Sequence, residues 1–495
     1  MGSAKKVFSG VLWSVLTNVF AALSGFIITP LLINYFGRSE YGIIALAGSI
    51  NAYMGLMDLG LSSTNVRFFS NWLSKGDTAR VRKLMQTCTA FYGVVGIINA
   101  LILIVAYFYT DQIFNVTPYQ DGILKNMVIV LAVTAFINWY TSCFGQLISA
   151  TENVAWVQKL SILTRILTII AVVITLVFKL SIFQYFVASI LAGLLVLPMT
   201  IQKVRKEVPC ISFLAKFDLT TFKEILPYSL AVFSFGIFQS VFHNSRTLIL
   251  GMQGTVEYVT DYGVMAALAG LVSTVSGVFV GALLPSSSRV VAQGDQDAYY
   301  RVAYQGTKLI SIALCFCAFG LMTIDKDLIM VYVGKDYVRL APWLNMWLIA
   351  TLTSHNSAIS SLILAGTKLK ALSYTSAFSA VIGILCCWFL VPLFESGGIV
   401  IGYIVYCYSQ ISFFYFYYWP KKMQINSWKV FTESFIPFVA IGALLSYVLT
   451  IVPHTDNHWI NIFIFGLLFA LLYLMIVWFI AKKEDRRLVL GLIRK

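Results

Sequence analysis

Residues 459–481 read WINIFIFGLLFALLYLMIVWFIA, a run with no charged side chain. About 20 predominantly apolar residues are enough for one helix to cross the hydrocarbon core of a bilayer. The rest of the chain has the same character, since 59% of its 495 residues are hydrophobic and only 11% are charged. This composition leaves too little polar surface for a water-soluble protein of that length.

Short polar stretches divide the chain into fourteen segments of this kind. Strands of a membrane barrel would alternate every second residue over about ten residues, and these runs are longer and more uniformly apolar. The sequence therefore predicts an all-α integral membrane protein of about fourteen spans. We predict the spans at 8–34, 42–68, 84–109, 126–149, 157–178, 182–202, 224–251, 259–284, 304–323, 341–365, 371–391, 399–419, 430–451 and 459–481.

Basic residues predict the orientation of these spans. With the N-terminus in the cytoplasm, 26 of the 35 Lys and Arg residues are assigned to cytoplasmic segments, including Lys159 and Lys308 in the first turns of their spans. Three more, Arg67, Arg165 and Arg246, are assigned to span interiors. Such a bias is typical of cytoplasmic loops, so both termini are expected inside the cell. It also explains the net charge of +14 through contact with anionic membrane lipids, without a nucleic-acid partner. The six basic residues expected outside are Arg38, Lys125, Lys179, Lys326, Lys335 and Arg339.

The sequence also repeats itself weakly. Three short patterns return in the same order about 217 residues later, and a repeated half within a hydrophobic chain is typical of membrane transporters. We therefore predict two pseudo-symmetric six-helix lobes, at 1–222 and 223–422, and two further helices with a basic tail at 423–495. The repeated patterns are Gly37–Tyr41 with Gly254–Tyr258, Gly76–Asp77 with Gly294–Asp295, and Leu147–Ala150 with Leu362–Ala365.

Catalysis is not expected. The longest stretches between spans are about twenty residues, well below the roughly 50 that a folded domain needs. No G-x-x-x-x-G-K-[ST] phosphate loop is present, so the chain carries no ATPase of that kind. We expect no catalytic site, no metal site and no cofactor, and the candidate coupling ions for transport are H⁺ and Na⁺.

Polar side chains within the predicted spans carry the functional information, because such residues in a membrane face a water-filled cavity or another helix. In the second span, Asn51, Asp58 and Asn65 recur at a spacing that predicts one helical face, with Arg67 just beyond it. Interhelical hydrogen bonding is the alternative for the amides, and reaching the headgroups is the alternative for the arginines. The other candidates are Gln239, His243 and Arg246 in the seventh span, Arg165 in the fifth, Asn18 in the first, and His355 and Asn356 in the tenth.

The stretch Pro30–Gly42, followed by Met57–Phe68, resembles the first two helices of the polysaccharide transporter (lipid-linked oligosaccharide flippase) family. That family belongs to the multidrug/oligosaccharidyl-lipid/polysaccharide exporter superfamily, and Arg246–Gly251 is similar to its second-half signature. The resemblance implies two six-helix bundles around a central cavity, two extra C-terminal helices, and alternating access.

The charged residues within the spans help to distinguish among the members of this superfamily. A carrier of organic cations should have acidic residues in its cavity, whereas Asp58 is the clearest acidic residue deep in a span, against three intramembrane arginines. We therefore expect a flippase in the bacterial cytoplasmic membrane that moves a polyprenyl-diphosphate-linked oligosaccharide to the outer leaflet for surface polysaccharide synthesis. It is expected to act as a monomer, with polysaccharide-assembly proteins as candidate partners. The alternatives are a drug or organic-cation antiporter of the same superfamily and a membrane-embedded glycan polymerase or transferase.

Overall fold

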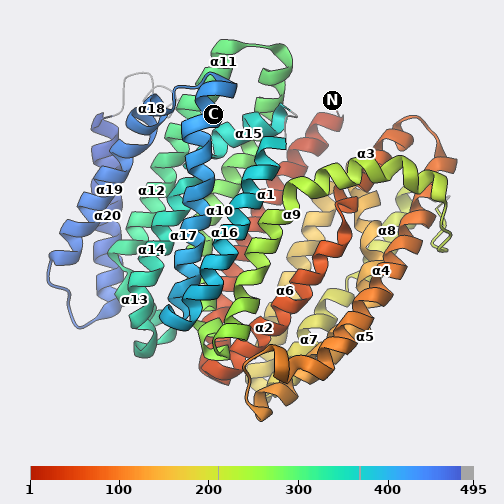
Figure 1. Cartoon of the computed structure of the whole chain (residues 1–495), viewed down its shortest axis with the longest axis horizontal. Coiled ribbons are helices and arrows are strands. Elements are labelled where there is room, and N and C mark those ends of the chain that lie inside the picture. Colours follow the sequence, from red (N-terminus) through yellow and green to blue (C-terminus); the bar gives the residue numbers. More distant parts are fainter. Residues whose placement is uncertain (1, 210, 367–369, 481–495) are drawn as a thin grey trace. The chain divides into compact units, whose positions relative to one another are not determined.

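The protein is helical throughout the part that the structure describes. A computed structural model describes residues 2–209, 211–366 and 370–480. All regular structure within these ranges is helix, which confirms the predicted all-α class (Figure 1). The basic tail predicted at the end of 423–495 falls in 481–495, outside the described residues.

The chain forms two compact units. The first comprises Met1–Val264 with Lys370–Gly402, and the second comprises Met265–Leu369 with Tyr403–Lys495. The first unit contains α1 (Gly2–Phe36), α2 (Arg38–Met54), the 3-10 turn η1 (Gly55–Asp58), α3 (Leu61–Ser74), α4 (Thr78–Ile113), α5 (Pro118–Ala150), α6 (Val154–Phe178), α7 (Ile182–Leu194), α8 (Leu197–Glu207), α9 (Leu219–Gln253) and α16 (Lys370–Phe394).

The second unit is built from shorter pieces, and two helices, α10 (Val256–Gln293) and α17 (Ser396–Phe413), contribute to both units. Its helices are α11 (Gln296–Arg301), α12 (Thr307–Thr323), α13 (Asp325–Val333), α14 (Ala341–Thr351), α15 (Ser357–Ala365), α18 (Ser427–Lys429), α19 (Ile436–Ile451) and α20 (His458–Ile480). Its 3-10 segments are η3 (Lys335–Leu340) and η4 (Leu352–Asn356), and its π-helical segments are η2 (Val302–Gly306), η5 (Phe414–Met423) and η6 (Val430–Phe435).

The number of membrane-crossing segments agrees with the prediction. Among the described residues, 12 helical segments are long and apolar enough to cross a bilayer, and two bent helix pairs raise the number to as many as 14. All fourteen predicted spans fall on these segments. One of the bent pairs is Arg38–Asp58 with Leu61–Ser74, which changes direction by 45°. The sequence therefore located the spans, but the prediction treated the second one as a continuous helix.

Several helices begin where a side chain satisfies free backbone N–H groups. Thr117 and Gln120 form a reciprocal capping box at the start of α5, and Pro118 occupies the first turn. Ser181 and Gln184 do the same for α7. Such caps matter here because an unpaired backbone group has no water to bond with inside a bilayer.

The first unit has a buried core between α3, α4, α5, α8 and α9. It includes Phe69, Tyr92, Phe144, Val204 and Ile225, none of which is more than 2% exposed. The helices α4 and α5 run side by side along much of their length (Figure 1). Between membrane helices such packing stabilises mainly through close van der Waals contact, since lipid tails are as apolar as the side chains.

One of the repeated sequence patterns adopts the same local structure in both copies. Gly76 and Gly294 have φ angles of 69° and 68°, a region that favours glycine. Asp77 and Asp295 each follow one of these glycines and cap α4 and α11 by accepting a backbone N–H three residues later. The division into lobes at 1–222, 223–422 and 423–495 stays a prediction. The other two repeated patterns lie at corresponding helix ends. Gly37 and Gly254 precede α2 and α10, and Leu147–Ala150 and Leu362–Ala365 end α5 and α15.

The two copies of the first repeated pattern lie against each other. We term this contact, formed by Arg38–Gly42 and Val256–Asp261, the α2–α10 junction. The Arg38 guanidinium donates to both oxygens of Asp261, at 3.1 and 2.7 Å, and the Asp261 side chain is fully buried. The Thr260 hydroxyl donates to the carbonyl oxygen of Arg38. A β-carbon on Gly42 would overlap the carbonyl oxygen of Val256, so only glycine allows the backbones to approach this closely.

Candidate functional site

The break in the second span is the centre of the candidate site. Leu59 and Gly60 both have left-handed backbone, with φ of 51° and 76°, and a β-carbon on Gly60 would lie 2.6 Å from the Ser229 carbonyl oxygen. The prediction that Asn51, Asp58 and Asn65 share one helical face is therefore wrong. The break changes the helical phase, so Asn51 is exposed, Asp58 is half-buried and Asn65 is fully buried.

Asp58 lies at the end of η1 and accepts three hydrogen bonds. Its Oδ1 accepts the Ser62 hydroxyl at 2.7 Å and the Tyr92 hydroxyl at 2.8 Å. Its Oδ2 accepts the backbone N–H of Ser62 at 3.1 Å, which caps the start of α3. Within the described residues, no basic side chain lies at ion-pair distance from this carboxylate.

A buried amide continues this network into the interior. Gln146 on α5 donates from Nε2 to the Ser62 hydroxyl at 3.0 Å and to the Tyr92 hydroxyl at 3.2 Å. Its Oε1 accepts Asn65 Nδ2 at 2.8 Å, and the Cys88 thiol donates to Asn65 Oδ1 at 3.2 Å. Gln146 and Tyr92 were not among the residues predicted from the sequence, although an amide inside the apolar run 126–149 is a visible signal.

The structure places neither Arg67 nor Arg165 in this network. Arg67 is exposed, and its guanidinium lies over the Tyr228 ring, 4.1 Å from the centroid. Arg165 on α6 and Asn18 on α1 are also exposed. In the described part of the chain, neither side chain forms a hydrogen bond with the Asp58 network. Their assignment to a substrate site stays a prediction.

Arg246 on α9 is the most buried of the three span arginines, at 7% exposure. Its Nη2 lies 2.6 Å from His243 Nδ1, which must therefore be unprotonated to accept the hydrogen bond. Its Cζ lies 5.5 Å from the centroids of both the Phe242 and Tyr262 rings. Aromatic faces attract a guanidinium through the negative charge of their π systems. Gln239, about two turns before Arg246 on α9, is exposed.

His355 and Asn356 belong to η4 in the second unit. His355 is 2% exposed, and its two ring nitrogens lie 2.9 Å from the Leu352 carbonyl oxygen and 2.6 Å from the Tyr415 hydroxyl. Its ring stacks on Phe435 with the centroids 3.9 Å apart. With both nitrogens occupied and the ring covered, His355 has the surroundings of a packing residue. Asn356 is half-buried, and ligand contact by either residue stays a prediction.

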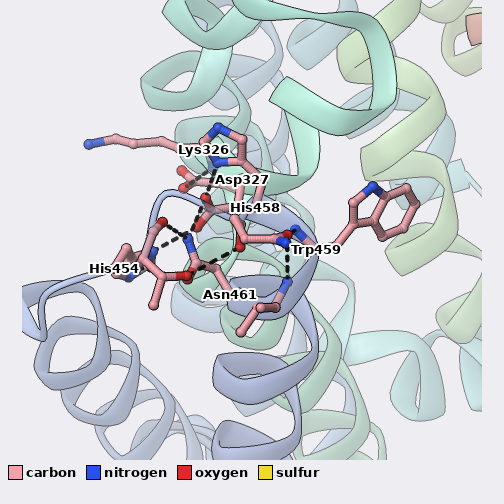
Figure 2. Close-up of polar contacts among 10 residues, drawn as sticks. Lys326, Asp327, His454, His458, Trp459 and Asn461 are labelled. Carbon is pink, nitrogen blue, oxygen red and sulfur yellow. Dashed lines mark hydrogen bonds and ion pairs between the residues drawn. The ribbon is translucent and has the colours of Figure 1, made fainter.

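A second polar cluster lies in the second unit, where α13 meets the connection from α19 to α20 (Figure 2). Asp327, with its side chain 8% exposed, accepts His458 Nδ1 at 2.6 Å and Asn461 Nδ2 at 3.0 Å on one oxygen, and His454 Nδ1 at 2.7 Å on the other. Burial opposes ionisation, but the donors from His458, Asn461 and His454 together hold the pKa of Asp327 below its ordinary value. This cluster was not predicted from the sequence, because Asp327 is more than 120 residues from its three partners.

This cluster predicts a pH-dependent attachment of the α19–α20 connection. Because the pKa of Asp327 is lowered by folding, its stabilising effect is present above the ordinary carboxyl value of 3.8 and is lost as pH falls through the lower folded value. Asp327→Asn should remove this stabilisation at neutral pH. We expect the attachment of the connection to weaken by about 1.5 kcal/mol, the low end for a hydrogen bond to a charged group. Hydrogen exchange of 452–461 measures the effect, and Asp336→Asn, at an exposed site, is the control.

Comparison with known proteins places this geometry in context. The family model described as "Polysaccharide biosynthesis protein" matches residues 7–291. The "Uncharacterized membrane protein EpsK" of Bacillus subtilis (strain 168) is 21% identical over 345 residues, which cover 68% of this chain and 66% of that protein, just under two thirds.

Solved structures show the same fold. "Lipid II flippase MurJ, inward closed conformation" aligns with a TM-score of 0.73 and 12% identity, over 94% of this chain and 99% of that one. A mutant of the Vibrio cholerae MATE transporter VcmN aligns with a TM-score of 0.59 and 15% identity, over 86% and 100% of the two chains. An inward-facing multidrug resistance MATE transporter of the MOP superfamily aligns with a TM-score of 0.57 and 13% identity, over 90% and 96%.

Proposed function

Because this chain belongs to the polysaccharide biosynthesis protein family, we propose that it is a flippase for a polyprenyl-diphosphate-linked oligosaccharide in the bacterial cytoplasmic membrane. It moves the lipid-linked sugar from the inner to the outer leaflet by alternating access, for surface polysaccharide assembly. It acts as a monomer, and its partners are membrane lipids and polysaccharide-assembly proteins.

The observation that carries this proposal is the buried cation on α9. Arg246 is held among His243 and two aromatic rings within a membrane span, where a positive charge is costly and usually functional. A guanidinium recognises a diphosphate through paired hydrogen bonds, and the exposed amides Asn51 and Gln239 suit a glycan. The polyprenyl tail stays among the lipids, so only the polar headgroup needs the protein.

The positive charge of Arg246 argues against the drug or organic-cation antiporter. Such a carrier needs a carboxylate open to its cargo, whereas Asp58 already accepts three hydrogen bonds from its own chain. A polymerase or transferase is disfavoured because the segments between spans are too short for a catalytic domain.

Deletion of the gene and assay of the lipid-linked intermediates test the proposal. Cells without the protein should keep the lipid-linked oligosaccharide in the inner leaflet and lose surface polysaccharide, and the restored gene should recover both. Normal surface polysaccharide in the deleted strain, with export of organic cations impaired instead, would favour the antiporter.

The distribution of basic residues predicts that both termini lie in the cytoplasm. A reporter fused after Lys495 should give a cytoplasmic signal, and one fused after Asp121, in the first turn of α5, should give an external signal. The same side reported at both positions would contradict the odd number of spans, eleven of the fourteen, that the prediction places between Asp121 and Lys495.

A further inference from the structure

The three π-helical segments of the second unit lie close together. The segment η2 contacts η6, and the short helix α18 contacts both η5 and η6. Figure 1 shows α18 at the same end of this unit as α11, which leads into η2, whereas α13 lies at the opposite end. A π-helix is rare in proteins and frequently lies at a functional site. We therefore searched this end of the unit for groups that could bind a ligand.

Three lysines expected on the cytoplasmic side lie here. Lys421 and Lys422 lie at the end of one candidate span, and Lys429 lies at the start of the next. All three side chains are exposed. Within the described residues, none of the three amines has a carboxylate at ion-pair distance. The segment 414–435 contains one acidic residue, Glu433, against these three lysines, so it carries a net positive charge.

The fold fixes the position of Lys429 through Tyr304 on η2. The Lys429 Nζ atom lies 5.0 Å from the centroid of the Tyr304 ring, whose face attracts a cation. The Tyr304 hydroxyl accepts the backbone N–H of Asn426 at 2.9 Å, and the Tyr304 carbonyl oxygen accepts the Ser434 hydroxyl at 3.0 Å. Tyr304 therefore joins η2 to both sides of α18, and its ring lies beneath one of the three amines.

Two buried donors close to the lysines in the chain lack a hydrogen-bond partner. Within the described residues, neither Trp419 Nε1 nor Ser427 Oγ has one, although both atoms are buried. The Trp419 carbonyl oxygen accepts the Ile425 N–H at 3.1 Å, so the chain folds back between these two donors. A buried donor without a partner costs free energy, and an oxygen atom of a bound molecule would remove that cost. Amines, an indole N–H and a hydroxyl together suit the oxygens of a phosphate.

Large apolar side chains are exposed beside the lysines. Phe416 is 82% exposed and Trp428 is 72% exposed. Tyr417 is also exposed, and its ring centroid lies 5.2 Å from the Lys421 amine. Tryptophan and tyrosine are enriched at the level of the lipid headgroups, where one part of the ring meets lipid and the other meets water. A free phosphate would leave these rings uncovered, whereas a phospholipid has both an anionic head and an apolar tail.

We propose that the second unit binds the phosphate of an anionic phospholipid of the cytoplasmic leaflet at a defined site. We term it the η5–η6 site, and it consists of Tyr304, Lys421, Lys422, Trp428 and Lys429. A general attraction of basic loops to anionic lipid depends on the number of charges alone. This site depends instead on which lysines are present and on the ring beneath Lys429. The lipid is a resident of the membrane and not the transported molecule, so the inference does not require the proposed flippase function.

The test measures binding of short-chain phosphatidylglycerol to the purified full-length protein by native mass spectrometry, with phosphatidylcholine as the lipid of no net charge. The variant that combines Lys421→Ala, Lys422→Ala and Lys429→Ala should bind phosphatidylglycerol more than about tenfold more weakly, because each lysine near an anionic lipid contributes roughly fivefold. Its binding of phosphatidylcholine should not change. Inorganic phosphate at the same concentration as phosphatidylglycerol should not displace it, because phosphate cannot cover the exposed rings.

A matched control removes the same charge from the first unit. It combines substitutions of three exposed lysines that are also expected on the cytoplasmic side, and it should bind phosphatidylglycerol nearly as the unmodified protein does. The control substitutions are Lys75→Ala, Lys216→Ala and Lys223→Ala.

A second comparison leaves every charge in place. Tyr304→Leu removes the ring beneath Lys429, and it should weaken phosphatidylglycerol binding by about two- to fivefold. Tyr304→Phe keeps the ring and should bind nearly as well as the unmodified protein. If Tyr304→Leu fails to fold, Trp428→Ser, at an exposed position, provides the uncharged test and should also weaken phosphatidylglycerol binding.

The outcomes are distinct. Equal losses in the two triple lysine variants would show that only the number of charges matters, and would overturn the site. Equal binding of phosphatidylglycerol and phosphatidylcholine, or full displacement of the lipid by inorganic phosphate, would overturn the choice of an anionic phospholipid. Because no transport is measured, none of these results depends on whether the protein is a flippase.

Discussion

Arg38→Ala should destabilise the first unit strongly, although Arg38 is partly exposed. The guanidinium is the bidentate partner of a fully buried carboxylate, Asp261, and removing one member of such a pair leaves the other as an uncompensated buried charge. We expect a loss of about 3 kcal/mol in unfolding free energy, at the low end for buried pairs because Arg38 itself is 35% exposed. Thermal unfolding of the detergent-solubilised protein measures this.

Two variants make the test specific. Arg38→Lys keeps the charge but cannot donate to both oxygens at once, so it should recover only part of the stability. Arg80→Ala breaks pairs with Asp77 and Glu224 that are largely exposed, and it should cost less than about 1 kcal/mol. Equal effects of Arg38→Ala and Arg80→Ala would contradict a stabilising role for the α2–α10 junction.

The sequence was sufficient to predict the fold class and the location of the spans, because both depend on composition and on the length of apolar runs. The run 459–481 needs no knowledge of its neighbours to be identified as a span. The echoes Gly76–Asp77 and Gly294–Asp295 also share a local structure, because a left-handed glycine followed by a capping aspartate is determined by nearby atoms.

The arrangement of the site was less predictable. The face expected for the second span assumed an uninterrupted helix, and the left-handed backbone at Leu59 and Gly60 invalidates that assumption. Only glycine at position 60 hinted at the break. The partners of Asp58 and Arg38 come from other helices, and residue 261 is 223 positions from residue 38. Pairings at that separation depend on tertiary packing, which one sequence without relatives does not specify.

Arg246→Ala tests the cationic part of the proposed substrate site. If the guanidinium holds the diphosphate, its removal takes away a charge-assisted contact of about 1.5 to 3 kcal/mol. That difference corresponds to a roughly 10- to 150-fold weaker binding of the lipid-linked probe. Arg246→Lys should retain part of the binding, since the charge survives without the planar fork.

Two further variants provide a control and test whether Arg246 acts only in packing. Arg289 follows the predicted span 259–284, but it still lies on α10, because that helix continues to Gln293. It is exposed there, so Arg289→Ala should leave both transport and stability unchanged. His243→Ala removes the partner of Arg246 and keeps the cation, so it should weaken binding less than Arg246→Ala does.

The readouts are probe binding by the purified protein and surface polysaccharide in cells that lack the native gene, with membrane levels of each variant measured in parallel. Arg165→Ala should add to the Arg246→Ala defect if both cations contact the headgroup, because two independent contacts contribute additively. Full activity of both variants, singly and combined, would instead assign Arg246 to packing between His243 and its aromatic neighbours and Arg165 to the membrane surface.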